Sequence, residues 1–194
     1  MTISRRALLT SALAAGLLPA TSALAQEAEP FPVKDESNKV DYKFRRRDVE
    51  FDTAEPAGTV VVDPKKKFLY LVLGGGQATR YGVSVGKYSK SWTGEVVIKR
   101  MAKWPVWTPT PEHIAAIPAL AKHLNGMPGG PDNPMGARAM YLYEGEIDTV
   151  NRIHGAAKVK DIGHNATAGC IGMLNVDVIH LYDRVQIGTR VVML

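Results

Sequence analysis

The sequence predicts a mainly β fold, a sandwich or open barrel with a few short helices. Short runs of β-branched and aromatic residues recur along the chain, and turn-forming residues separate them. Only two segments have helical spacing, and we find no internal repeat. The predicted strands are Thr59–Val62, Phe68–Leu73, Arg80–Val85, Val96–Met101, Ala139–Tyr143, Arg152–His154 and Arg190–Leu194.

Turns and caps delimit these elements. Asp63-Pro64-Lys65-Lys66 separates the first two strands and predicts a hairpin, and three consecutive glycines at 74–76 predict the next turn. Thr110 is the expected N-cap of a first helix that runs to Asn125-Gly126 with a kink at Pro118. Asn175 is the expected N-cap of a second helix, which Gly188 ends.

The N-terminus has the pattern of an export signal. Arg5 and Arg6 precede an apolar stretch, and Ala23-Leu24-Ala25 fits a cleavage site, so residues 1–25 are predicted to be a signal peptide. The adjacent arginines also resemble a twin-arginine signal. The stretch is short for a membrane span, so we expect no transmembrane anchor. Residues 26–57 are polar and predicted to be an extended lead-in, and residues 58–194 are enough for one domain.

The charge balance argues against a nucleic-acid partner. The 24 basic residues include Arg5 and Arg6 of the signal, which leaves 22 against 19 acidic residues, or +3. This excess is too small for a phosphate-binding surface. Because the N-terminus predicts export, we expect the protein in the periplasm or cell envelope.

Cys170 is the only cysteine of the chain, so it has no partner for an intrachain disulfide. It is a buried, unreactive residue, half of an intermolecular bridge, or a nucleophile. Small neighbours, Gly169 and Gly172 among them, leave the sulfur accessible and the backbone N–H groups free to face a substrate.

A nucleophilic thiol needs a base, and two histidines are the main candidates. His154 ends a predicted strand just before Gly155, and His164 lies in a loop six residues before the thiol. An alternative is a catalytic zinc site formed by His154, His164 and Cys170, although close ligand pairs such as C-x-x-C are absent.

The stretch from Ile153 to Asn175 resembles the signature of the L,D-transpeptidase (YkuD-like) catalytic domain, an H-G pair followed by [S/T]-x-G-C-[I/V]-R-[M/L]-x-N. This chain has His154-Gly155 and then Thr167-Ala168-Gly169-Cys170-Ile171-Gly172-Met173-Leu174-Asn175. Other segments before and after this stretch also resemble the family, so the resemblance covers about residues 52–194, nearly the whole mature chain.

The resemblance implies that Cys170 attacks the L-to-D peptide bond of a peptidoglycan stem and that an amine resolves the acyl-enzyme. His154 is then the base, the Gly155 carbonyl orients it, and backbone N–H groups of Ala168, Gly169 and Cys170 form the oxyanion hole. Thr167 supports that turn. The expected substrate-binding residues are Arg138, Tyr141, Trp107, Gly172 and His164.

The same resemblance implies no cofactor and no metal, a monomer, and covalent inhibition by carbapenem-type β-lactams. Two departures from the signature matter, because Ala168 replaces the usual His or Ser and Gly172 replaces the usual Arg. The alternatives are therefore an L,D-carboxypeptidase or endopeptidase that hydrolyses stem peptides at this site, or a non-catalytic wall-binding domain. The type of cross-link, 3–3 or 1–3, stays open.

Overall fold

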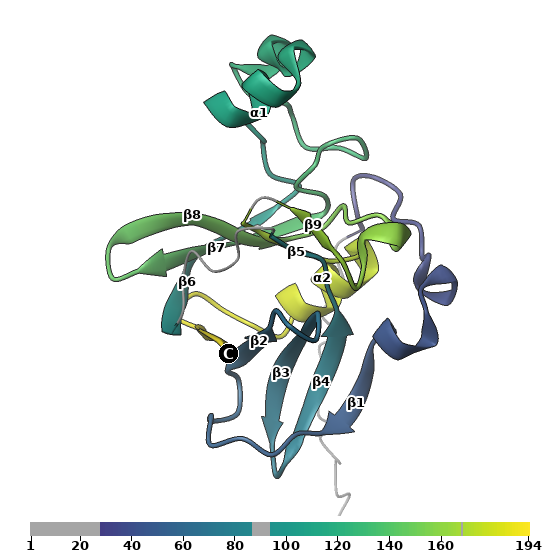
Figure 1. Cartoon of the computed structure of the whole chain (residues 1–194), viewed down its shortest axis with the longest axis vertical. Helices are drawn as coiled ribbons and strands as arrows, with labels where there is room; N and C mark the ends of the chain where they lie inside the picture. The colour runs from purple at the N-terminus through teal and green to yellow at the C-terminus, as the bar shows by residue number, and fades with distance from the viewer. Residues whose placement is uncertain (1–27, 87–93, 168) are drawn as a thin grey trace, which may run out of the picture.

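The computed structural model describes residues 28–86, 94–167 and 169–194, so the predicted signal peptide, Gln26 and Ala168 lie outside the described residues. Most elements are strands, which confirms the predicted mainly β fold (Figure 1). The strands are β1 Arg47–Glu50, β2 Val60–Asp63, β3 Phe68–Gly74, β4 Gln77–Gly82, β5 Val85–Gly86, β6 Gly94–Lys103, β7 Arg138–Glu144, β8 Ile147–His154, β9 Asn165–Thr167, β10 Ile171–Gly172 and β11 Arg190–Met193.

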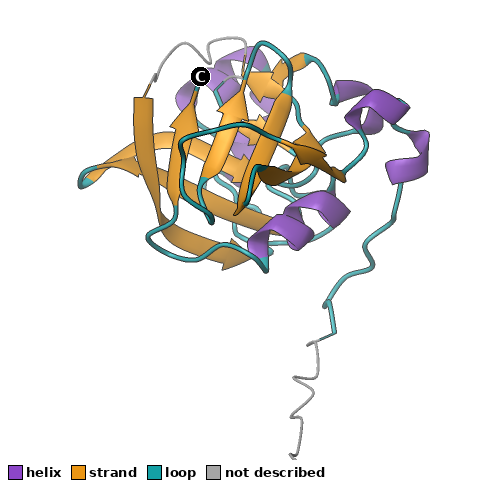
Figure 2. Ribbon diagram, turned by 90° about the horizontal axis from the view of Figure 1, so that it is seen from below, coloured by secondary structure: helices purple, strands orange, loops and turns teal. Residues whose placement is uncertain are grey.

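Nine of these strands form one sheet in the order β1-β4-β3-β2-β11-β6-β7-β8-β10, and β5 pairs with β9 beside it. Neighbours in the large sheet are mostly antiparallel, but β11 is parallel to β2 and β10 is parallel to β8. In Figure 2 the strands of this sheet cross at large angles, as a strongly twisted sheet requires.

The core lies between the halves of this sheet and the helix α2 (Asn175–Tyr182). Its buried side chains come from every strand of the large sheet except β1, from β5 and from α2, so distant parts of the chain share one core. The predicted hairpin is present, because Val60 pairs with Leu71 and the Asp63 carboxylate accepts hydrogen bonds from the backbone of Lys65 and Lys66.

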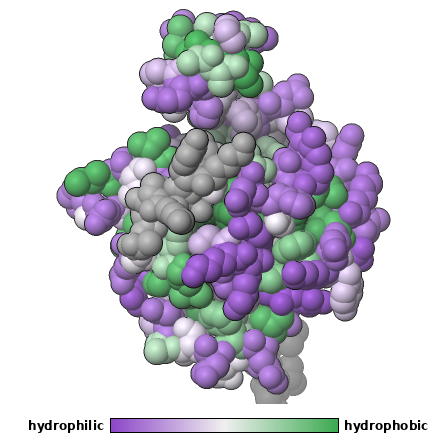
Figure 3. All heavy atoms as spheres, viewed as in Figure 1, coloured by the Kyte–Doolittle hydropathy of each residue, from purple (hydrophilic) through white to green (hydrophobic). Residues whose placement is uncertain are grey.

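The first predicted helix is wrong in its length. Thr110 caps α1 (Pro111–Ala116) by accepting from the His113 backbone N–H, but Pro118 ends the α-helix instead of kinking it. A 3-10 helix, η4 (Pro118–His123), follows. This α1–η4 segment projects from the sheet (Figures 1 and 3) and buries none of its residues, so its apolar side chains do not belong to the core.

Residues 28–57, predicted to be extended, contain regular structure. Two 3-10 turns, η1 (Ser37–Lys39) and η2 (Tyr42–Phe44), precede β1, and β1 pairs with β4 at one edge of the sheet. A third turn, η5 (Val159–Asp161), lies between β8 and β9. Among the described residues, no helix is long and apolar enough to cross a membrane.

The predicted cap of the second helix is also wrong. Leu174 takes the N-cap position of α2, and the side chain of Asn175 turns away to bond other loops. The tertiary contact thus outcompetes the local cap.

Candidate active site

His154 ends β8, and Cys170 immediately precedes β10, the strand that pairs with β8. The two strands run parallel, with Ile153 opposite Ile171. Both isoleucines are buried in the core. Because successive side chains alternate between the faces of a sheet, Cys170 projects on the same face as Arg152 and His154. His154 and Cys170, sixteen residues apart in the sequence, thereby lie on one face at the same end of the sheet.

The His154 imidazole is held by backbone carbonyls. Its Nδ1 lies 2.7 Å from the carbonyl oxygen of Gly155, and the Pro134 carbonyl is a second acceptor near the ring. Since a carbonyl only accepts, Nδ1 carries the proton in this contact, which leaves Nε2 as the basic nitrogen.

Burial sets the protonation states of both groups. Burial lowers the pKa of His154, and the Arg152 charge adds to this effect against the carbonyl hydrogen bonds. Burial raises the pKa of the Cys170 thiol, opposed by a hydrogen bond from the Arg152 backbone and by the Arg152 charge. These directions favour a neutral thiol beside a neutral imidazole over a thiolate–imidazolium pair at rest.

Asn175 fixes the loops on both sides of the His154-Gly155 pair. Its Oδ1 accepts from the backbone N–H groups of Ala137 and Ala156, each at 3.0 Å. A Cβ at Gly155 would lie 2.2 Å from this oxygen, so only glycine fits there. The carbonyl that holds His154 is therefore positioned by a side chain from α2.

Asn133 organises the loop that precedes β7, and the sequence reasoning did not identify it. It is 1% exposed, and its Oδ1 accepts from the Met135 backbone N–H at 2.8 Å. Its Nδ2 lies 3.0 Å from three carbonyl oxygens, which share its two hydrogens and belong to Pro105, Met127 and Pro128. The cluster of Asn, Pro and Gly around it was the available signal.

Two predicted substrate-binding residues lie on the His154 face of the sheet. Tyr141 is opposite Arg152, and Ala139 is opposite His154, so all four side chains share that face. Trp107 packs into the same cluster as Ala139 and Tyr141. The structure thus brings Tyr141 and Trp107 to the side of the sheet that carries the thiol.

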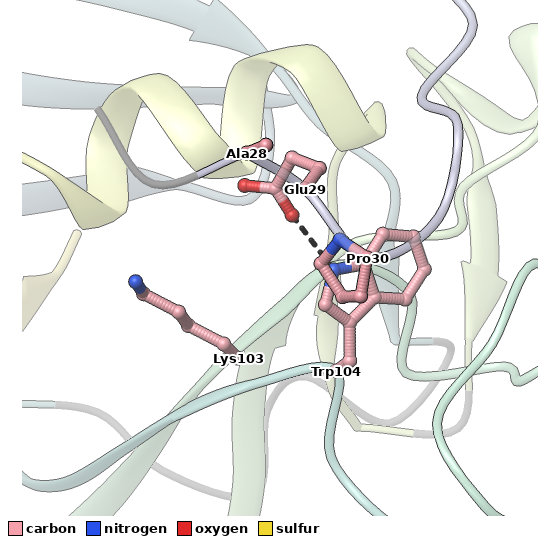
Figure 4. A pocket seen from close by; sticks show the side chains of 5 residues that line it. All are labelled: Ala28, Glu29, Pro30, Lys103 and Trp104. Atoms are coloured by element: carbon pink, nitrogen blue, oxygen red, sulfur yellow. Dashed lines mark hydrogen bonds between the residues drawn. The ribbon is translucent and has the colours of Figure 1, made fainter. Parts of the chain in front are cut away.

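Arg138 takes the opposite face, toward α2. It is 3% exposed, its guanidinium lies 5.3 Å from the Tyr182 ring, and both of its terminal nitrogens bond the Glu29 carboxylate. The Trp104 indole N–H donates to the same carboxylate at 2.7 Å, at the edge of a pocket of about 300 Å³ (Figure 4). Arg138 is therefore occupied by the N-terminal segment and is not brought together with Cys170.

The remaining predicted residues surround the thiol loop. Gly172 is buried opposite His154, and its backbone exchanges two hydrogen bonds with Ser84. His164 is exposed in the loop before β9, whose last residue is Thr167. Gly169 lies so close to Asn151 that a Cβ would be 2.6 Å from its Oδ1. Ala168 lies outside the described residues.

The described part of the chain holds no group of three or more His, Cys, Asp or Glu side chains placed to bind a metal ion. His154, His164 and Cys170 are all in that part, so the zinc alternative lacks its ligand cluster.

The sequence reasoning also passed over Arg152. The available signal was its position two residues before His154 in one strand, which places both on one face. Its guanidinium binds both oxygens of Asp148, at 2.7 and 2.8 Å, and lies 4.4 Å from the Tyr141 ring centre.

Known proteins with similar sequences were found by comparison. The sequence profile of the YkuD family, the L,D-transpeptidase catalytic domain, matches residues 57–193. A putative L,D-transpeptidase from Fuscovulum blasticum is 33% identical over 98% of this chain and 97% of its own length. The chain spans less than half the length of several other curated L,D-transpeptidases that it matches.

Solved structures agree on the fold. A Brucella melitensis protein described as a probable carnitine operon oxidoreductase is 49% identical, with a TM-score of 0.55 over 83% of this chain and all of its own. An L,D-transpeptidase solved in complex with imipenem superposes with a TM-score of 0.50 over 71% of this chain and 59% of its own, at 17% identity, which shows the fold alone.

Proposed function

Because the chain belongs to the L,D-transpeptidase catalytic domain family, we propose that it is a cysteine-dependent peptidoglycan L,D-transpeptidase with Cys170 as nucleophile. The observation that supports this most is the parallel pairing of β8 with β10, the strand that directly follows Cys170, because it favours a thiol on the face of His154. The surviving thiol and imidazole, together with the loops that support them, favour an enzyme over a non-catalytic wall-binding domain.

In the proposed first step, the Cys170 sulfur attacks the carbonyl carbon of the L-to-D bond while Nε2 of His154 accepts the thiol proton. The tetrahedral oxyanion is stabilised by the backbone N–H groups of Ala168, Gly169 and Cys170. Collapse of this intermediate breaks the C–N bond, and His154 returns the proton to the departing D-amino acid.

In the second step, an amine from a neighbouring stem attacks the thioester and releases Cys170. Water in place of the amine gives hydrolysis, the carboxypeptidase or endopeptidase alternative. The neutral resting pair suits this cycle, because each group exchanges one proton with its partner and neither needs a metal or cofactor.

We place this activity in the periplasm or cell envelope, where its peptidoglycan substrate lies, and we expect a monomer. We also propose that carbapenem-type β-lactams acylate Cys170, in line with the relative solved with imipenem.

The test is to incubate the exported form of the protein with purified stem peptides and identify products by mass spectrometry. Cross-linked dimers support transpeptidation, trimmed monomers support hydrolysis, and unchanged input supports a binding domain. Cys170→Ala is expected to abolish all turnover, since the chain has no other thiol. Turnover by this variant comparable to wild type would contradict the covalent mechanism.

A further inference from the structure

Two arginines flank Tyr141 on the face of the sheet that carries His154. Tyr141 in β7 lies between Arg100 in β6 and Arg152 in β8, and it pairs with both. Each guanidinium lies 4.4 Å from the centre of the Tyr141 ring. The ring is only 7% exposed, so the two guanidinium groups are held against a fixed aromatic surface.

The two arginines differ in what they bind. Arg152 is engaged by Asp148 through two hydrogen bonds, and its side chain is 14% exposed. Arg100 is exposed, and it shares Asp148 with Arg152, since the charge of Arg100 is one of the causes that lower the pKa of Asp148. The cluster of Arg100, Tyr141, Arg152 and Asp148 therefore keeps one uncompensated positive charge.

The cluster extends from the thiol across neighbouring strands of the sheet. Cys170 is beside Arg152, and Arg100 is two strands further on. With strands about 4.8 Å apart, the backbones of Cys170 and Arg100 are separated by roughly 14 Å, part of which the arginine side chain spans. An extended peptide that rises about 3.3 Å per residue reaches this distance within a few residues of the scissile bond.

We propose that Arg100, held by Tyr141 and backed by Arg152, is a subsite for a carboxylate of the peptide substrate. A planar guanidinium held in place binds a carboxylate through two parallel hydrogen bonds, as Arg152 already binds Asp148. Ordering costs are low, because stacking on Tyr141 fixes the side chain before the ligand arrives. This inference rests on the proposed function, since it assigns a contact within the same substrate.

The test compares two synthetic stem tetrapeptides, one with free carboxylates and one with those groups amidated. Their dissociation constants are measured by calorimetry in a Cys170→Ala background, so that no turnover interferes. The background protein is expected to bind the free peptide about tenfold more tightly than the amidated one. Adding Arg100→Gln should remove this preference and leave the amidated peptide within twofold, and Arg100→Lys should restore part of it.

Arg47→Gln is the matched control, because Arg47 also stacks on a tyrosine, 4.7 Å from the ring of Tyr42, but lies in β1 at the far edge of the sheet. It should leave both dissociation constants unchanged. Equal binding of the two peptides, equal weakening of both by Arg100→Gln, or no binding at all would overturn the subsite. Absence of turnover by the wild-type protein, measured separately, would instead overturn the proposed function.

Discussion

Arg138 and Arg152 lie on adjacent strands and each binds a carboxylate, yet they project from opposite faces of the sheet. Arg138 faces α2, is 3% exposed, and ties down Glu29 from the N-terminal segment. Arg152 faces His154 and Cys170, and its partner Asp148 is four residues away in the same strand. The comparison teaches that Arg138 attaches the N-terminal segment, while the charge of Arg152 lowers the pKa of the thiol against the larger, opposite effect of burial.

After the complete loss of turnover expected from Cys170→Ala, the largest effect is expected on the face of the sheet that carries His154, from His154→Ala. Loss of a general base slows acylation by about 10²–10⁴-fold, whereas His164→Ala is expected to slow it little, because His164 is an exposed loop residue. Single-turnover acylation by a stem peptide measures both.

A larger effect of His164→Ala would contradict this assignment of the base. If activity were lost on exhaustive chelation and recovered with zinc, a metal site of His154, His164 and Cys170 would replace the mechanism.

On the face of the sheet that carries Arg138, Glu29→Gln is expected to lower the free energy of unfolding and to leave the rate of acylation unchanged. Removing the carboxylate leaves the buried Arg138 guanidinium without its charged partner, at a cost of about 1–3 kcal/mol in the free energy of unfolding. Urea unfolding measures it. Glu36→Gln removes a surface partner of Lys39 and is the control, with no measurable change expected.

The cost of Glu29→Gln should depend on pH. The pKa of Glu29 is lowered, and the hydrogen bond from Arg138 is the largest cause. The hydrogen bond from Trp104 and the charges of Arg138 and Lys103 lower it further, whereas burial raises it. A lowered folded-state pKa stabilises the fold above the unfolded value of about 4.3, and this contribution disappears as the pH falls through the folded value. A difference between wild type and Glu29→Gln that persists unchanged in acid would contradict the ion pair.

The role of Arg152 on the His154 face can be tested through the pH dependence of acylation. The profile should fall on the acid side at a pH below the ordinary histidine pKa, since burial lowers the pKa of His154. It should fall on the alkaline side above the ordinary cysteine pKa, since burial raises the pKa of Cys170. The Arg152 charge lowers both pKa values, so Arg152→Gln should move both limbs to higher pH.

This shift is measured as kcat/KM against pH, with Arg47→Gln as the control that leaves both limbs in place. A profile that loses height without moving would mean that Arg152 acts only through packing.

The smallest effect is expected from Gly172→Arg. Gly172 follows Cys170 by two residues, so a side chain there points to the thiol face, beside a strand that already carries Arg152. We expect crowding to reduce kcat/KM by about tenfold or less, which is 1.4 kcal/mol at most. Unchanged or higher activity, with ordinary 3–3 links in digested walls, would mean that the glycine has no functional effect.

Local pattern located most of the longer strands, but it missed β1, β9 and β10. Runs such as Phe68–Leu73 are continuously apolar and end at turn residues, so they were predicted close to their observed bounds. The pair His154 and Cys170 was found because the residues that support it, Gly155, Gly169 and Asn175, are local in the sequence.

Local pattern failed where a distant partner decides. Residues with helical spacing around Ile117 were predicted to form one kinked helix, yet Pro118 ends the α-helix and none of the helical residues is buried. Arg138 was expected to bind substrate, but strand alternation and its partner Glu29 put it on the face of the sheet opposite His154.

The sequence by itself determined the mainly β fold and the family, and it singled out Cys170 and His154 as the candidate nucleophile and base, because each depends on residue types at short spacings. Only the tertiary structure decided which face each arginine takes, what Asn175 binds, and that Arg100 and Arg152 meet at Tyr141. These features depend on the register between strands far apart in the chain, and a shift of one residue would move every side chain to the other face.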